Sequence, residues 1–185
     1  MSVVGNVWYD GQDAMPHSRP DPSDYAIYHE RYVSLVPDGA IADTLARQFD
    51  EYLPFYRGIS DAQAAHRYAP GKWSIKQVIG HVADTERIFG YRGLAVSRGE
   101  RQTLLAFEQD EYVAGANFDD RSLHDLLDEL ASVRAATITL FASMSDELLA
   151  RRGKAWQAEI TPLACAFVIA GHERYHVQHL RERYL

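Results

Sequence analysis

The segment GHERYHVQH, residues 171–179, places His172, His176 and His179 at spacings of four and three. On a helix that turns about 100° per residue, these three side chains fall within roughly 60° of arc on one face. An inward-facing imidazole needs a partner for each ring nitrogen. A divalent ion meets that need, because neutral imidazole binds zinc, nickel or iron at about 2 Å.

The three histidines cannot all bind one ion with equal ease. His172 and His179 lie about 10.5 Å apart along a helix axis, whereas residues three or four apart are neighbours. The spacing therefore leaves two alternatives, His172 with His176 or His176 with His179. Two exposed histidines, or two histidines bonded to carbonyl oxygens, are the ordinary explanation of an isolated HxxxH pair.

A further histidine, His81, lies in the segment GHVADTE and shares a helix face with Val78 and Ile88. An isolated inward-facing histidine is more often a core residue bonded to a backbone carbonyl. Together with a histidine pair on a facing helix, however, it makes a three-ligand site with open positions, as in catalytic zinc sites. Asp84 and Thr85 share the face of His81, and a carboxylate there is expected to accept the second N–H of the ring.

The remaining histidines have plainer interpretations. His17 falls in an irregular N-terminal segment and His66 falls in a loop, while His29 and His124 are expected at the surface.

Apolar residues recur at helical spacing in four segments, which predicts helices over residues 41–56, 74–98, 123–141 and 161–185. Ser74 and Gln77 form a capping-box pattern at the start of the second helix, and Gly99 ends it. Thr161 followed by Pro162 is typical of a helix start. Short helices are also expected within 25–36 and after residue 145.

These elements predict an all-α fold, a four-helix bundle. Residues 100–120 form its long crossover connection, with Phe107 and Tyr112 as expected anchors, and 58–72 form a loop. No segment alternates with period two, so no sheet is expected. Prolines and glycines mark residues 1–24 as an irregular N-terminal arm, and 25–185 as the bundle domain.

Composition narrows the classes of function. The chain has 185 residues and a net charge of −7, which repels phosphate backbones and argues against a nucleic-acid partner. Its only cysteine, Cys165, cannot form an internal disulfide. Neither a signal peptide nor an apolar run of membrane-spanning length is apparent, so we expect no membrane association and a cytoplasmic location.

Two blocks carry a family resemblance, KWSIKQVIGHVADTERIFGYR at 72–92 and AGHERYHVQHLRERYL at 170–185. The segments FEQDEYV (107–113) and SVRAAT (132–137) fit the same pattern. Taken together, the blocks resemble the DinB-like superfamily of bacterial metal-binding four-helix bundles. The resemblance covers most of the chain from about Tyr25 onward.

The resemblance implies a metal site formed by His81, His172 and His176, which selects the first of the two histidine pairs. The cofactor it implies is one divalent metal ion: zinc, nickel or iron. The family often has another histidine directly before the last ligand, where this chain has Tyr175. Homodimers are common in the family, so a homodimer is expected here.

The resemblance also suggests a reaction. Enzymes of the family include transferases and isomerases that use bacillithiol, mycothiol or glutathione, which implies a metal-dependent transferase acting on a low-molecular-weight thiol. One alternative is a metal-dependent hydrolase, for which Asp84, Glu108 and Asp110 are candidate general bases by residue type. Another is a non-enzymatic, stress-linked metal-binding protein. Because no glycine-rich phosphate loop is present, no nucleotide cofactor is expected.

Overall fold

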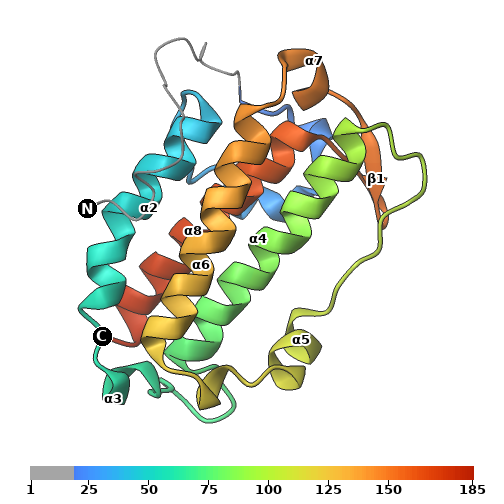
Figure 1. The fold of residues 1–185 in the computed structure, drawn as a ribbon. Helices are drawn as coiled ribbons and strands as arrows, with labels where there is room; N and C mark the ends of the chain where they lie inside the picture. Colours follow the sequence, from blue (N-terminus) through green and yellow to red (C-terminus); the bar gives the residue numbers. More distant parts are fainter. Residues whose placement is uncertain (1–18) are drawn as a thin grey trace.

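The computed structural model describes residues 19–185, and four long helices dominate this part of the chain. They are α2 (Ile41–Arg57), α4 (Ile75–Ser97), α6 (Leu123–Ala142) and α8 (Pro162–Arg183). Figure 1 shows them packed side by side, with α4 and α6 running in one direction and α2 and α8 in the other. The expected helical bundle is confirmed.

The helix ends follow the local sequence signals. Ser74 Oγ accepts the Gln77 N–H at 3.1 Å, and Gln77 Oε1 accepts the Ser74 N–H at 3.0 Å, which completes the capping box of α4. Gly99 follows α4 with φ +87°, a conformation that glycine adopts without strain. The side chain of Thr161 caps α8 through the Ala164 N–H at 3.1 Å.

Because α4 and α6 are parallel, the chain must return the length of the bundle between them (Figure 1). This crossover contains α5 (Gln109–Gly115) and the 3-10 turn η4 (Phe118–Asp120). Phe107 is partly buried against the core, as expected, but Tyr112 is 46% exposed, so its expected role as an anchor is wrong. Val113 and Phe118 are buried instead, and Phe118 packs where Gly80 of α4 has no side chain.

Several short helices complete the fold: η2 (Pro22–Asp24), η3 (Ile27–His29), α1 (Glu30–Val33), α3 (Asp61–Ala64) and α7 (Asp146–Leu149). The short helix expected within 25–36 is thus divided between η3 and α1, and the one expected after residue 145 is α7. A turn of helix, α3, lies inside the predicted loop 58–72, where Ser60 and Gln63 form a capping box.

A small hairpin departs from the all-helical expectation. Strands β1 (Gly153–Ala155) and β2 (Ala158–Ile160) pair antiparallel, with Ala155 opposite Ala158. The expectation of no sheet is therefore wrong, because three-residue strands are too short to display a period of two. The crossover supports the hairpin, since the Leu104 N–H donates to the Lys154 carbonyl at 2.9 Å.

The first described residues lie against the bundle. Arg19 donates to the carbonyls of Val33 at 2.7 Å and Val36 at 2.6 Å, and the Thr161 N–H donates to the Asp24 carbonyl at 3.2 Å. The boundary predicted between the arm and the bundle, at residues 24 and 25, stays a prediction. Most of the arm, including His17, lies outside the described residues.

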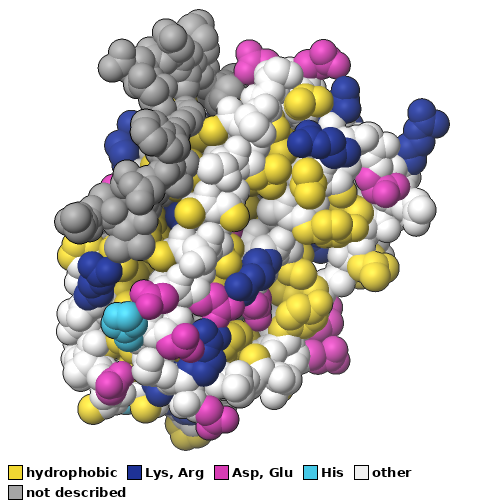
Figure 2. All heavy atoms as spheres, in the orientation of Figure 1, with side chains coloured by type: hydrophobic (Ala, Val, Ile, Leu, Met, Phe, Trp, Pro, Cys, Tyr) yellow, Lys and Arg dark blue, Asp and Glu magenta, His cyan; other side chains and the backbone are white. Residues whose placement is uncertain are grey.

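The surface of the bundle is mixed in character. Figure 2 shows acidic and basic side chains interspersed over the face that α4 and α6 present. Among residues 19–185, no helix is long and apolar enough to cross a membrane.

Candidate metal centre

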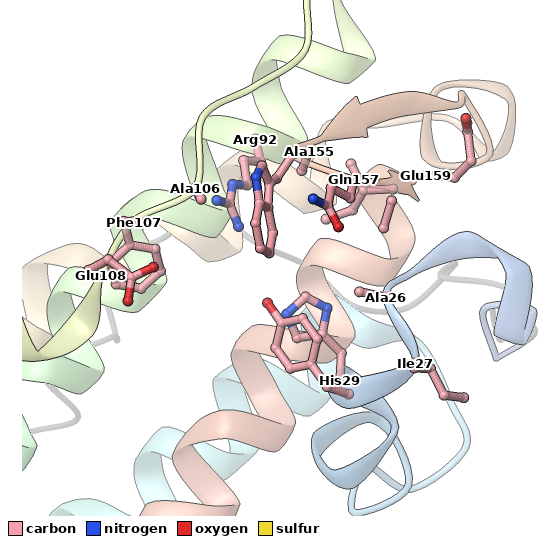
Figure 3. Close-up of a pocket in the computed structure, with 14 residues that line it drawn as sticks. Ala26, Ile27, His29, Arg92, Ala106, Phe107, Glu108, Ala155, Gln157 and Glu159 are labelled. Carbon is pink, nitrogen blue, oxygen red and sulfur yellow. The ribbon is translucent and has the colours of Figure 1, made fainter.

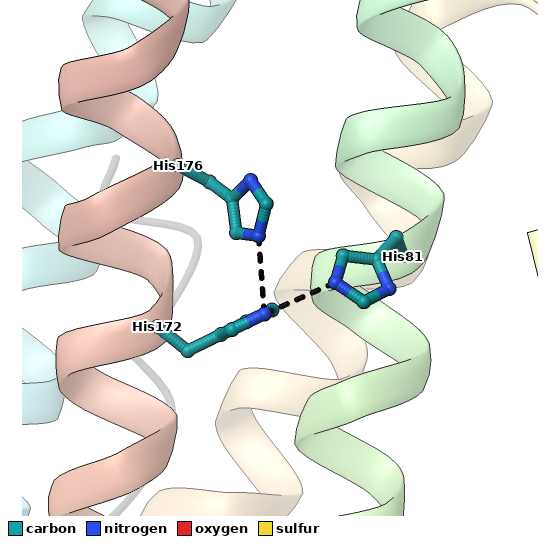
Figure 4. A group of neighbouring side chains, drawn as sticks. All are labelled: His81, His172 and His176. Atoms are coloured by element: carbon teal, nitrogen blue, oxygen red, sulfur yellow. Dashed lines mark hydrogen bonds between the residues drawn. The ribbon is translucent and has the colours of Figure 1, made fainter. Parts of the chain in front are cut away.

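Three imidazole rings from two helices converge inside the bundle. Nε2 of His172 lies 3.0 Å from Nε2 of His81 and 3.1 Å from Nε2 of His176 (Figure 4). One nitrogen of each ring lies within 4.8 Å of the others. His81 comes from α4, whereas His172 and His176 come from successive turns of α8. The structure thus brings together the three residues that the resemblance singled out.

These rings are withdrawn from solvent. His81 and His172 are 2% and 4% exposed, and His176 has a buried Nδ1 without a hydrogen-bond partner among the described residues. Burial lowers the pKa of His81 to about 4. Burial, reinforced by the neighbouring imidazoles, lowers the pKa of His176 to about 3 and holds the pKa of His172 well below its usual range. All three rings are therefore neutral near pH 7 and have a free lone pair.

The donor set fits a divalent ion. Two nitrogen ligands that each lie about 2 Å from a tetrahedral ion are about 3.3 Å apart. The Nε2 atoms of His81 and His176 lie at similar distances, 3.0 and 3.1 Å, from Nε2 of His172. A neutral imidazole nitrogen either donates one hydrogen or accepts one. Nε2 of His172 faces two other Nε2 atoms, so hydrogen bonds among these three atoms cannot satisfy all of them at once. A cation that accepts a lone pair from each ring serves all of them.

The second nitrogen of His81 faces a hydroxyl rather than the expected carboxylate. Nδ1 of His81 lies 3.5 Å from Oγ1 of Thr85. Asp84 instead pairs with Arg87 at 3.4 Å, so its expected role as acceptor for His81 is wrong. Asp84 and Thr85 are adjacent on α4, but Thr85 is buried at 3% exposure, whereas the Asp84 side chain is 26% exposed beside Arg87.

Aromatic side chains surround the three histidines. The ring centroid of Trp73 lies 4.7 Å from that of His81, and that of Tyr32 lies 5.1 Å from that of His172. Tyr175, where the family often has histidine, packs its ring edge-on to His176 at 5.4 Å. His179 lies outside the converging group and stacks on Tyr175 at 6.4 Å.

One side of the histidine group opens into a cavity of about 290 Å³, lined in part by Tyr28, His29, Tyr32, Thr85, Phe107 and Glu108. Of the three candidate bases, only Glu108 lines this cavity. Asp110 lines a separate cavity with His176, and Asp84 lines neither. His29 is only 5% exposed, so its expected surface position is wrong, whereas His124 is exposed and His66 lies in a loop, both as expected.

A buried ionic cluster lies beside the histidines and was missed by sequence reasoning. Arg134 of α6 is fully buried and binds the two Glu86 oxygens at 2.9 and 2.8 Å and Glu173 at 2.9 Å. Glu173 also accepts from Gln48 Nε2 at 2.6 Å and from the Tyr56 hydroxyl at 3.3 Å. The sequence signal was an arginine one helical turn from Leu130 and Ile138 on the apolar stripe of α6.

This cluster joins α2, α4, α6 and α8 at the level of the histidines. Glu173 directly follows His172, and Glu86 directly follows Thr85. Because each carboxylate has a fixed partner, the cluster sets how α4 and α8 lie against each other. The positions of the imidazole rings depend on that relation.

The fold and site together define a class of protein, a four-helix bundle in which three histidines from two helices bring one ring nitrogen each within 4.8 Å of the others, close enough to hold a metal ion. The family model for the DinB superfamily matches residues 44–180, and the chain belongs to that superfamily.

A solved structure supports the same fold. The chain is similar to YfiT from Bacillus subtilis, described as a probable metal-dependent hydrolase with an unusual four-helix bundle topology. The TM-score is 0.66 and the sequence identity is 15%, over 90% of this chain and 91% of that one. No curated protein sequence matches the chain.

Proposed function

We propose that this protein is a metal-dependent enzyme whose centre is one divalent ion, either zinc, nickel or iron, held by His81, His172 and His176. The observation that carries the proposal is the convergence of three neutral, buried imidazoles on one point. When bound, the ion supplies Lewis acidity, which lowers the pKa of a coordinated thiol or water.

The surrounding residues have separate tasks in this proposal. Thr85 orients the His81 ring, because its hydroxyl faces Nδ1 and leaves Nε2 directed at the centre. Trp73 and Tyr32 exclude water from two sides of the rings. The cavity beside the histidines leaves one side open for a small substrate.

The reaction we propose first is that of a transferase acting on a low-molecular-weight thiol, which joins the thiol sulfur to an electrophilic substrate. The family resemblance suggests this reaction. Among the described residues, no carboxylate hydrogen-bonds to the three rings. A thiol bound at such an ion would be held as the thiolate, its nucleophilic form, and would need no separate general base. The chain's own thiol is unsuited to this role, because burial raises the pKa of Cys165 to about 12.

Hydrolysis is the second candidate, and Glu108 favours it. Its carboxylate lines the cavity that His81 and His172 also line, and a general base must reach the attacking water. YfiT, which shares the fold, is described as a probable hydrolase. A non-enzymatic role in metal binding is the remaining alternative, which predicts metal without turnover.

Elemental analysis tests the metal centre. Purified wild-type protein is expected to contain about one divalent ion per chain, and His81→Ala is expected to lose it. His179→Ala is the matched control, since this histidine lies on the same helix but outside the converging group. Equal metal content in His81→Ala and wild type would remove His81 from the centre. Loss in His179→Ala would favour the other histidine pair.

An activity screen separates the reactions. Metal-loaded protein is assayed with bacillithiol, mycothiol and glutathione against a panel of electrophiles, and with ester and amide substrates without thiol. Thiol consumption that disappears in His81→Ala supports the transferase. Thiol-independent hydrolysis that falls at least 100-fold in Glu108→Gln supports the hydrolase instead. Stoichiometric metal with neither activity would favour the non-enzymatic role.

We also propose a homodimer and a cytoplasmic location, which rest on the resemblance and on the single cysteine, respectively. Light scattering tests the first, with an expected mass twice the 20.9 kDa of one chain. Cell fractionation tests the second.

A further inference from the structure

A second cavity adjoins the one beside the histidines. It encloses about 400 Å³ between the hairpin, the N-terminal segment and α4. The two cavities share four lining residues: Tyr28, His29, Phe107 and Glu108. Figure 3 shows Arg92 and His29 directed into this second cavity, which Trp156 of the hairpin also lines.

Arg92 is a buried cation without a carboxylate partner. It is 5% exposed, and its one hydrogen bond to a described residue is from Nη2 to the Leu105 carbonyl at 2.7 Å. Its guanidinium lies 4.8 Å from the ring centroid of Phe89 and 6.0 Å from that of Phe107. The other buried arginine among residues 19–185, Arg134, binds two carboxylates. A buried charge normally has such a partner, so Arg92 retains donors for an anion from outside the chain.

His29 supplies a second unpartnered polar group in the same place. Its side chain is 5% exposed, and its buried Nδ1 has no hydrogen-bond partner among the described residues. Its ring contacts Phe89 edge-on at 5.3 Å, the same ring that lies under the Arg92 guanidinium. A buried ring nitrogen with no partner costs free energy, and in the tautomer that carries the hydrogen on Nδ1 this nitrogen would donate to an anion.

Two carboxylates also line the cavity, Glu108 and Glu159. Figure 3 shows them at opposite ends, with Arg92 and His29 between them. Neither carboxylate forms an ion pair with Arg92. Glu108 is exposed and Glu159 is half-buried, so solvent screens both from the middle of the cavity, where the buried cation lies.

We propose that this cavity binds the carboxylate of a small organic acid, with Arg92 as the principal donor and His29 as the second. The walls formed by Tyr28, Phe107 and Trp156 suit an apolar or aromatic body next to that carboxylate. If the protein has the function proposed above, this acid is the substrate, and its reacting end extends past the residues shared by the two cavities toward His81 and His172.

Calorimetry with chelator-treated protein tests the binding itself. The probe is 4-phenylbutyrate, and the matched neutral probe is 4-phenylbutyramide, which has the same shape without the charge. We expect the acid to bind at least 10-fold more tightly than the amide, because charge-assisted bonds are about twice as strong as neutral ones. Equal affinity for the two probes, or no affinity for the acid, would overturn the proposal.

A pair of variants locates the site. Arg92→Met is expected to lose at least 10-fold in affinity for 4-phenylbutyrate. Arg98→Met, at the exposed C-terminal end of the same helix, is expected to bind as wild type does. Because methionine suits the aromatic surroundings of Arg92, we expect Arg92→Met to melt no lower than wild type. Unchanged affinity in Arg92→Met would contradict the assignment.

A second readout uses the wild-type protein, so it does not depend on whether Arg92→Met folds. The acid is expected to shift the indole N–H resonance of Trp156, identified from its disappearance in Trp156→Phe, and the amide is expected to shift it far less. The same titration on His81→Ala separates the two proposals. Retained acid binding there supports this cavity whether or not the metal centre is correct, and loss of binding in His81→Ala would overturn the assignment to Arg92 and His29.

Discussion

At the scale of single residues, the environment of each charge decides its role. Arg134 and Arg92 are both buried arginines on helices of the bundle, but Arg134 binds Glu86 and Glu173 whereas Arg92 meets aromatic rings and one carbonyl. The first arrangement holds helices together. The second leaves a cation available to a ligand, and for that reason only the first should be needed for stability.

Arg134→Met tests this difference. Removing the guanidinium leaves two buried carboxylates without their partner, which is expected to lower the free energy of unfolding by about 3–5 kcal/mol. The control is Arg121→Met, whose ion pairs with Asp125 and Glu129 are more exposed than those of Arg134 and should each contribute only about 0–1 kcal/mol. Urea denaturation followed by circular dichroism measures both. Similar losses in the two variants would contradict a special role for Arg134.

At the scale of elements, the helices approach closely where glycine allows it. A Cβ on Gly171 would overlap the backbone carbonyl of Tyr32, so α1 lies directly against α8 at the residue before His172. This contact also positions the N-terminal segment that carries His29 and Tyr32 next to the histidines. Gly90 of α4, by contrast, has nothing within 4 Å of the place a Cβ would occupy.

Gly171→Ala and Gly90→Ala therefore have opposite expected effects. Alanine at 171 must push the α1 backbone away, which should cost about 1–3 kcal/mol or more. Alanine at 90 enters open space in a helix interior and should stabilise by up to about 1 kcal/mol. Thermal melting of both variants checks the pair. A destabilised Gly90→Ala would indicate a contact at that position that the described residues do not account for.

The turn of the hairpin contains a strained backbone conformation at Trp156. Trp156 has φ +52°, in the left-handed region where glycine is favoured, and it is 62% exposed. A bulky residue in that conformation is uncommon and stores roughly 1–3 kcal/mol. Burial does not repay this cost. The proposed acid-binding cavity, of which Trp156 forms a wall, gives the strained position a use.

At the scale of the whole molecule, the proposed metal binding would be linked to folding. Because His81 belongs to one helix and the other two histidines to another, the three rings meet only in the folded chain. An ion that binds the folded state alone stabilises it by about 2.7 kcal/mol at 100 times its dissociation constant. For a chain of this length, that corresponds to an increase in Tm of about 5–11 °C.

Melting with added zinc or nickel, and again after chelation, measures this linkage. We expect the increase in Tm to disappear in His81→Ala and to persist in His124→Ala, whose side chain is 85% exposed on α6. An increase of equal size in His81→Ala would show that the ion stabilises the fold from another place. No increase in wild type at any metal concentration would contradict the proposed centre.

Much of this protein could be predicted from the sequence, because the signals concerned are local. The helix starts at Ser74 and Thr161 depend on side chains that reach only a few residues along the chain. The face shared by His172 and His176 follows from the helical repeat alone. The bundle architecture follows from four long amphipathic segments. His81 was indicated by its inward-facing helix position, and the family resemblance selected His172 and His176 as the pair that accompanies it.

Other features were decided by tertiary structure, because they depend on residues far apart in the sequence. The role of Arg134 required two carboxylates, 48 and 39 residues away, to enter the same interior. The sequence predicts a surface position for His29, but in the folded chain the rings of Phe89 and Tyr28 pack against it and it is buried. Spacing along one helix says which side chains share a face, but only packing between helices says what that face meets, and burial then sets the charge each group can hold.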